Sequence, residues 1–171
     1  MNTQATLPTF GVIVPGAGGR LGAIMRGALV DGKRQPDYAI IVPDLRTLDL
    51  PWGEYGKVIE GANSFSDGLA NTEAMLKAST RSMNAAAKFI AGLRKNHGFP
   101  DLYIGARGEM MTLRANVPEL FDKVTHWTST QGSADNAVAQ DFEYGLSGWF
   151  TKGSKFRVRA LRRIQLQHFN A

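Results

Sequence analysis

The sequence predicts a single-domain α+β protein, and three observations lead to this prediction. Short apolar runs separated by glycine and proline fill residues 1–60, helical spacing follows over residues 72–96, and strand and turn patterns run from Thr125 onward. Strands, helices and strands in that order favour α+β over an alternating α/β sheet. A length of 171 residues suits one domain, residues 1–171.

The composition is that of an ordinary globular protein. Hydrophobic residues make up 43% and charged residues 20% of the chain, so extended disorder is not expected. Because the chain has no cysteine, disulfides and thiolate metal sites are excluded. The N-terminus lacks a secretory signal, and no run reaches the roughly 20 apolar residues of a membrane span. We therefore expect a protein made in the cytosol that does not insert into membranes.

Residues 1–36 form a glycine- and proline-rich segment that includes a predicted β-hairpin. Asp31-Gly32 lies between the apolar runs Leu21–Val30 and Tyr38–Val42. Asp-Gly between apolar runs is a strong local signal for a hairpin turn.

Two helices are predicted in the middle of the chain. Residues 72–96 carry an apolar stripe at helical spacing, and Gly98 and Pro100 end that helix. A shorter helix covers Gly108–Ala115, and Pro118–Phe121 adds a turn. The stripe consists of Met75, Leu76, Met83, Ala86, Ala87, Phe89, Ile90 and Leu93.

A polar cluster precedes the longer helix. A hard cation could bind there, but a turn that caps the helix is the simpler interpretation, with Asn71 or Thr72 as the cap and Glu73 in the first turn. The cluster comprises Ser64, Ser66, Asp67, Asn71 and Thr72.

Basic residues crowd the end of the chain and contribute to a net charge of +5. They could serve an anionic partner such as nucleic acid or an acidic glycan. We favour an arginine-bearing strand paired with carboxylates, because no aromatic stacking pattern accompanies the charges, and we do not expect a nucleic-acid partner. The residues are Lys152, Lys155, Arg157, Arg159, Arg162 and Arg163.

The segment Val12–Gly22 resembles the glycine fingerprint of a dinucleotide-binding fold. Gly16–Gly22 would hold a pyrophosphate at the start of a helix over residues 23–29, and Asp44 would take a ribose hydroxyl. This motif suggests an NAD(P)-dependent reductase as an alternative. Two observations count against this interpretation: the segment before Asp31-Gly32 is short for a crossover helix, and no alternation of strands and helices follows it.

A different resemblance covers residues 37–164. It starts from Trp127-Thr128-Ser129-Thr130, continues through Ala137, Phe142 and Gly145, and closes on Val158-Arg159-Ala160-Leu161-Arg162. This pattern resembles the C-terminal domain family of the collagen-like adhesin Lcl. Upstream, Asp101–Met110, Asp67-Gly68 with Asn71-Thr72, and Trp52-Gly53 are similar to the versions of this domain carried by bacteriophages and prophages.

The Lcl resemblance implies a C-type-lectin-like fold, related to sulfatase-modifying enzymes and to variable receptor-binding domains of some phages. The chain departs from the family pattern at Ile104-Gly105, where Leu-Pro is usual, and at His126, where an aromatic residue is common. Because one fold serves several functions, the fold alone does not assign one.

The sequence contains no recognisable catalytic or metal site, and we expect no cofactor. His97, His126 and His168 are far apart, so we interpret them as surface or turn residues. Trp127 is followed by Thr128 rather than by calcium ligands. Without cysteine, the oxidation chemistry of the sulfatase-modifying relatives cannot apply. The carboxylates near the end of the chain are scattered: Asp122, Asp135, Asp141 and Glu143.

The aromatic residues of the terminal strands divide into contact and core candidates. Asn136, Tyr144, Trp149 and Phe150 are the candidates for binding a ligand or partner, because turns display contact residues. Internal packing of these aromatic side chains stays open as the alternative. The predicted core residues are Trp127, Phe142, Phe156 and Val158.

These observations favour a non-enzymatic bacteriophage or prophage virion protein, assembled in the host cytoplasm and forming part of a tail tip or fibre that recognises a host surface molecule. A structural head-decoration or baseplate subunit is the alternative. The expected partners are other virion subunits, further copies of this chain in a homo-oligomer, and a host glycan or protein. The tail at residues 165–171 lies beyond the predicted closing strand and suggests attachment to a neighbouring subunit.

Overall fold

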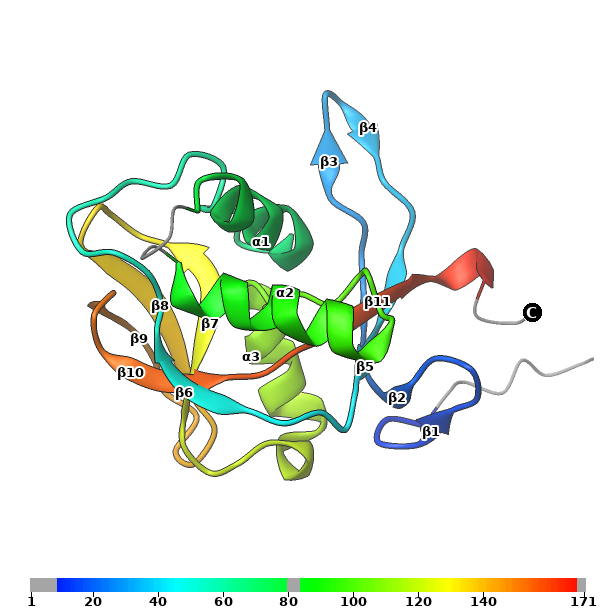
Figure 1. Cartoon of the computed structure of the whole chain (residues 1–171). Helices are drawn as coiled ribbons and strands as arrows, with labels where there is room; N and C mark the ends of the chain where they lie inside the picture. The colour runs from blue at the N-terminus through cyan, green and yellow to red at the C-terminus, as the bar shows by residue number, and fades with distance from the viewer. Residues whose placement is uncertain (1–8, 80–83, 169–171) are drawn as a thin grey trace, which may run out of the picture.

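The computed structural model describes residues 9–79 and 84–168, and it is α+β as predicted. Helices and strands occur in the order strands, helices, strands (Figure 1). The helices are α1 (Gly68–Lys77), α2 (Ala85–His97) and α3 (Arg107–Asn116), with 3-10 turns η1 (Pro118–Leu120) and η2 (Leu166–His168). The strands are β1 (Ile13–Val14), β2 (Gly19–Met25), β3 (Leu29–Val30), β4 (Lys33–Arg34), β5 (Tyr38–Val42), β6 (Leu48–Pro51), β7 (Thr125–Gln131), β8 (Asn136–Asp141), β9 (Ser147–Thr151), β10 (Lys155–Val158) and β11 (Arg162–Gln165).

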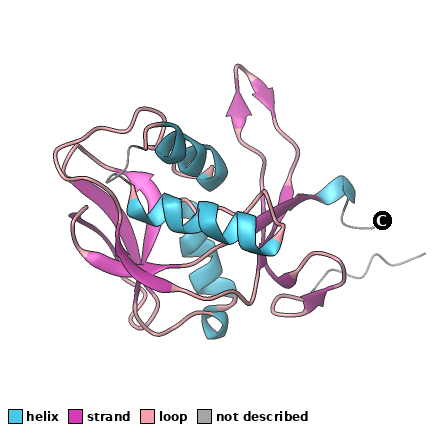
Figure 2. Ribbon diagram, viewed as in Figure 1, coloured by secondary structure: helices cyan, strands magenta, loops and turns pink. Residues whose placement is uncertain are grey.

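Two sheets lie on opposite sides of the helices. One sheet has the order β1-β2-β5-β11, the other β6-β10-β7-β8-β9, and β3 pairs with β4 in a separate hairpin. Figure 2 shows the helices gathered between and over these sheets. α3 contacts strands of both sheets, β2 on one side and β7 and β8 on the other. The helices therefore join the two sheets into one packed body.

The predicted hairpin at Asp31-Gly32 is confirmed. Both residues have positive φ, 48° for Asp31 and 75° for Gly32, as a type I′ turn requires. Leu29 pairs with Arg34 and Val30 pairs with Lys33 across the turn. The hairpin continues into the pairing of β2 with β5 and projects from the body of the molecule (Figure 1).

The glycine fingerprint at Gly16–Gly22 forms a β-hairpin, so the dinucleotide interpretation of this motif is wrong. β1 pairs antiparallel with β2, and the expected helix over residues 23–29 is instead strand and loop. The pairing of β2 with β5 shifts register between Leu21 and Ala23, so these two buried side chains pack into different core clusters on the two faces of the sheet. There is no helix N-terminus here to hold a pyrophosphate.

The predicted helix over residues 72–96 is two helices, α1 and α2. Met83 of the predicted stripe lies outside the described residues. Asp67 caps α1 by accepting a hydrogen bond from the Ala70 amide, so the predicted caps are wrong: Asn71 and Thr72 lie within the helix and are buried. α2 ends where predicted, with Gly98 at φ 69° closing the last turn. The shorter helix and the turn at Pro118 also agree with the prediction.

The C-terminal run does not form one closing strand. β10 lies between β6 and β7 in one sheet, whereas β11 pairs with β5 in the other. Between them Leu161 exchanges backbone hydrogen bonds with Tyr103, at 2.9 and 2.8 Å. Gln165 is the last residue of β11, and the Leu166 amide donates to the Asp37 carbonyl at 3.0 Å, so the start of the predicted tail belongs to the fold.

Candidate recognition surface

β9 is the outermost strand of its sheet and carries Trp149 and Phe150, two of the four predicted contact residues. The turn before it, at residues 142–146, is shaped by Asp141, whose carboxylate accepts hydrogen bonds from the Glu143 and Tyr144 amides at 3.0 Å each. Gly145 has φ 84°, which only glycine adopts readily. This turn reverses the chain and presents Tyr144 to solvent.

Large side chains along β9 and its turn are exposed. The exposed fraction is 76% for Tyr144, 72% for Leu146, 55% for Trp149 and 38% for Phe150. Exposed large apolar side chains that gather on a strand and the turn before it are more informative than single ones, because they indicate an interaction surface. We name this group, Tyr144, Leu146, Trp149 and Phe150, the β9 surface.

Trp149 and Asn136 lie together at a small cavity of about 130 Å³, with Gly132 and Ser133 as its other walls. The Trp149 ring covers Gly132 so closely that a Cβ there would lie 2.1 Å from a ring carbon. The Arg107 guanidinium lies 5.7 Å from the centroid of the Trp149 ring. An aromatic face beside a cation and polar groups can hold a ligand that has both apolar and hydroxyl faces.

Phe150 and Tyr144 lie apart from this cavity. Successive residues of a strand point to opposite faces, so Phe150 faces away from Trp149 and packs edge-on against Phe156 at 5.0 Å. Tyr144 lies beyond the end of β9 that pairs with Gln140, whereas Asn136 pairs with the other end. The structure thus brings together two of the four predicted contact residues.

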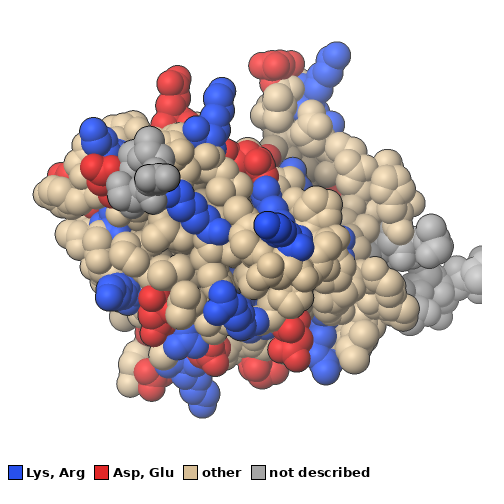
Figure 3. All heavy atoms as spheres, in the orientation of Figure 1, with Lys and Arg blue, Asp and Glu red and all other residues tan. Residues whose placement is uncertain are grey.

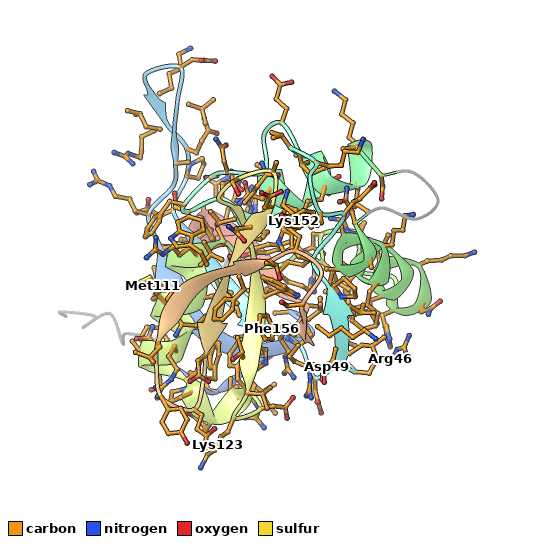
Figure 4. All side chains as sticks on the ribbon, turned by 90° about the vertical axis from the view of Figure 1, so that its left-hand side faces the viewer. Arg46, Asp49, Met111, Lys123, Lys152 and Phe156 are labelled. Carbon is orange, nitrogen blue, oxygen red and sulfur yellow. The ribbon has the colours of Figure 1, made fainter. Side chains whose placement is uncertain are left out.

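The predicted core residues are inside or against the core. Trp127 and Val158 are fully buried and Phe142 nearly so. Phe156 is half-buried and packs on Trp127 at 4.8 Å. In Figure 4, which looks onto this sheet, Phe156 lies midway along it and Lys152 near one end.

Three of the C-terminal arginines pair with carboxylates, as predicted. Arg162 binds both oxygens of Asp101 at 3.0 Å, and Arg163 binds Asp67 at 3.0 Å. Arg157 pairs with both Asp49 and Asp122. On the face in Figure 3, basic and acidic side chains alternate rather than forming a field of one sign.

Glu109 is a buried carboxylate that the sequence analysis did not single out. It accepts hydrogen bonds from the Tyr38 and Tyr103 hydroxyls at 2.8 and 3.0 Å, and from the Ala106 and Gly68 amides at 2.7 and 3.1 Å. Burial raises its pKa to about 7. The sequence could have indicated this residue by its position in the first turn of α3, because a glutamate there accepts a hydrogen bond from the backbone amide that precedes the helix. Because the side chain is fully enclosed, its role is to join α3 to α1.

Lys152, one of the basic residues that crowd the end of the chain, is also buried. Its Nζ donates to the Gln131 Oε1 at 2.7 Å and to the Lys57 carbonyl at 2.5 Å, and lies 4.9 Å from the Trp52 ring centroid. Burial lowers its pKa to about 8. The ammonium therefore holds the loop before α1 against the five-stranded sheet.

His126 is buried, so its assignment as a surface or turn residue is wrong. Its ring packs edge-on against Phe121 and Phe142 at 5.5 and 4.8 Å, and its Nδ1 lies 2.9 Å from the Val124 carbonyl. Burial lowers its pKa to about 4. A neutral ring thus packs within this aromatic cluster. His97 and His168 are exposed, as predicted.

Within residues 9–79 and 84–168, no three His, Asp or Glu side chains gather closely enough to hold a metal ion. In the same described part of the chain, no helix is long and apolar enough to cross a membrane. Comparison with models of known protein families finds no match, and comparison with curated proteins finds none either.

Proposed function

We propose that this chain is a non-enzymatic bacteriophage or prophage virion protein that forms part of a tail tip or fibre and attaches to a host surface glycan or protein. The observation that carries the proposal is the β9 surface, a set of exposed aromatic and apolar side chains on an edge strand and in the turn before it. The sequence resemblance to phage versions of the Lcl C-terminal domain supports it, and with it we propose a C-type-lectin-like topology.

The cavity at Trp149 suits a saccharide best. A sugar ring offers an apolar face that stacks on an aromatic ring and hydroxyls that bind polar groups. Trp149 provides the ring, and Asn136 and Ser133 provide polar groups within the same cavity. Gly132 leaves room for the ring to lie flat against the turn.

The molecule has two opposite ends, one formed by β9 and the other by the N-terminal strands and η2. In Figure 1 the strand β9 lies on the left, while β1, the β3–β4 hairpin and η2 lie on the right. The right-hand end also exposes large apolar side chains, Val12, Ile13, Leu29 and Val30. We propose that this end contacts other virion subunits, including further copies of the chain, and leaves the β9 surface free.

The same exposed apolar residues favour a second candidate function. If the N-terminal end and the β9 surface both bury against neighbours, the protein is a head-decoration or baseplate subunit. In that case its aromatic residues contact other virion proteins and no host molecule.

A cell-binding assay with matched variants tests the first proposal. Trp149→Ala and Tyr144→Ala remove side chains of the β9 surface, and Gly132→Ala displaces the Trp149 ring without removing it. Tyr55→Ala is the control, because Tyr55 is an equally exposed aromatic residue outside this surface. We expect binding to fall at least about tenfold in the Trp149 and Gly132 variants, as for a residue at the centre of an interface, and to persist in the control.

Two results would contradict host recognition. One is equal binding by Trp149→Ala and the unmodified protein. The other is a protein that binds no cells but assembles onto particles, which would establish the structural role instead. Imaging labelled particles would then place the chain at the head, baseplate or tail.

A further inference from the structure

The glycine-rich hairpin forms one wall of a cleft of about 500 Å³. Gly18, Gly19 and Arg20 line one side, Asp44 follows β5, and Arg159 lies in the crossover between β10 and β11. Neither glycine leaves room for a side chain: a Cβ on Gly18 would lie 2.5 Å from the Phe99 ring, and one on Gly19 would lie 2.5 Å from the Val42 carbonyl oxygen. The glycines therefore allow close packing of the wall, and the cleft has the volume of a small-molecule site.

Arg159 differs from the neighbouring arginines. Arg157, Arg162 and Arg163 each pair with a carboxylate, whereas Arg159 forms no ion pair with any described residue. Its Nη2 donates to the Pro43 carbonyl at 3.0 Å, and its guanidinium lies 5.6 Å from the Phe121 ring centroid. Its Nε is buried and has no hydrogen-bond partner among the described residues. Arg159 is half-buried, lines the cleft and has no carboxylate in an ion pair with it, so its guanidinium is suited to an anionic partner there.

A second guanidinium lines the same cleft. Arg20 is exposed, donates through Nη1 to the Gly11 carbonyl at 2.9 Å, and forms no ion pair among the described residues. Asp44 also lines the cleft; its charge and that of Asp122 favour the charged form of Arg159, but neither forms an ion pair with Arg159 among the described residues. Two guanidinium groups against one carboxylate leave the cleft with a positive charge and one strong hydrogen-bond acceptor.

We propose that this cleft binds a small acid that also carries hydroxyl groups, of the acidic-sugar class. Its carboxylate or phosphate binds Arg159 and Arg20, and Asp44 accepts a hydrogen bond from a ligand hydroxyl. The inference does not rest on the proposed function, because the cleft and the β9 surface share no residue. A cell-binding result at Trp149 therefore leaves it unchanged.

Isothermal titration calorimetry with three probes tests the site: glucuronate, glucose 6-phosphate and glucose. We expect at least one of the two acids to bind and glucose not to bind. Arg159→Gln and Arg20→Gln should each weaken binding at least about tenfold, since each removes a charge-assisted hydrogen bond. Arg26→Gln is the matched control, because it removes the same charge from an exposed arginine outside the cleft.

The probes also distinguish the source of the acid group. Binding of glucuronate alone assigns a carboxylate, and binding of glucose 6-phosphate alone assigns a phosphate. If Arg159→Gln does not fold, the titration of Arg20→Gln is sufficient to test the site, because Arg20 is exposed. Binding of neither acid, or equal weakening by Arg26→Gln and Arg20→Gln, would overturn the proposal.

Discussion

Glu109 and His126 are buried ionisable residues whose shifted pKa values have opposite effects on stability. Burial favours the neutral form of each, so it raises the pKa of the acid and lowers the pKa of the base. The folded protein therefore binds the Glu109 proton more tightly, and the His126 proton more weakly, than the unfolded chain. Stability depends on pH through this difference in bound protons.

For Glu109 the stabilising contribution is complete below its ordinary pKa of 4.5 and is lost as the pH rises toward its folded value of about 7. The shift corresponds to about 3 kcal/mol. Glutamine does not ionise, so in Glu109→Gln this residue should no longer lower the free energy of unfolding as the pH rises from 4.5 to 7. Urea unfolding across this range measures it. The substitution also costs about 1–3 kcal/mol at any pH, because an amide cannot accept from all four donors.

For His126 the direction is reversed. Its contribution is complete above its ordinary pKa of 6.5 and is lost as the pH falls toward about 4. The magnitude is again about 3 kcal/mol, so the two terms nearly cancel in the unmodified protein. Glu109→Gln should therefore become less stable on acidification, whereas His126→Leu should become more stable between pH 7 and 4.5. Parallel slopes in the two variants would contradict this account.

The break between α1 and α2 is an element that local sequence did not reveal. Asn84 adopts a left-handed conformation, φ 56° and ψ 51°, at the start of α2, and its Nδ2 donates to the Met75 carbonyl of α1 at 2.7 Å. This contact lets α2 start in a new direction. The apolar stripe runs through both helices and so resembled one continuous helix.

Substitution of Asn84 tests how this break is held. Asn84→Ala loses both the hydrogen bond to Met75 and the tolerance of asparagine for the left-handed conformation, so we expect the free energy of unfolding to fall by about 2 kcal/mol. Asn84→Gly also loses the hydrogen bond, but glycine adopts the left-handed conformation without strain. Its free energy of unfolding should therefore fall by only about 1 kcal/mol. Chemical unfolding measures both values. Equal losses would mean that the left-handed conformation carries no strain.

Elements with local signals were predictable, and those that depend on distant partners were not. Asp31-Gly32 specifies its turn by itself, and Gly98 ends α2 because glycine readily adopts positive φ. The burial of Lys152 depends instead on Trp52 and Gln131, which are far away in the sequence. For the candidate recognition surface, exposure of Trp149 was predictable, but its cavity with Gly132 required the turn geometry of the folded chain.

At the scale of the whole molecule, the C-terminal run links the two sheets. β10 belongs to the five-stranded sheet, and after three connecting residues β11 completes the other sheet beside β5. Arg162 and Arg163 of β11 add ion pairs to Asp101 and Asp67, which lie near α2 and at the start of α1. The sequence showed the charges and the strand pattern. It did not show the change of sheet, because both halves have similar strand propensity.

Truncation tests whether β11 holds the two sheets together. A chain that ends at Leu161 lacks β11, leaves β5 as an unpaired edge, and leaves Asp101 and Asp67 without their arginines. We expect it to lose at least about 3 kcal/mol and to lose its single cooperative transition, because the four-stranded sheet loses a strand that covers its core. Far- and near-ultraviolet circular dichroism during urea unfolding measure both effects.

The control for this truncation is a chain that ends at His168, which keeps β11 and η2. It should unfold like the full-length protein, with coincident transitions by both probes, since every described backbone hydrogen bond of β11 remains. If the chain ending at Leu161 is as stable as this control, the crossover would be a passive connection. The packing of α3 against β2 on one side and β8 on the other would then be sufficient to hold the sheets together.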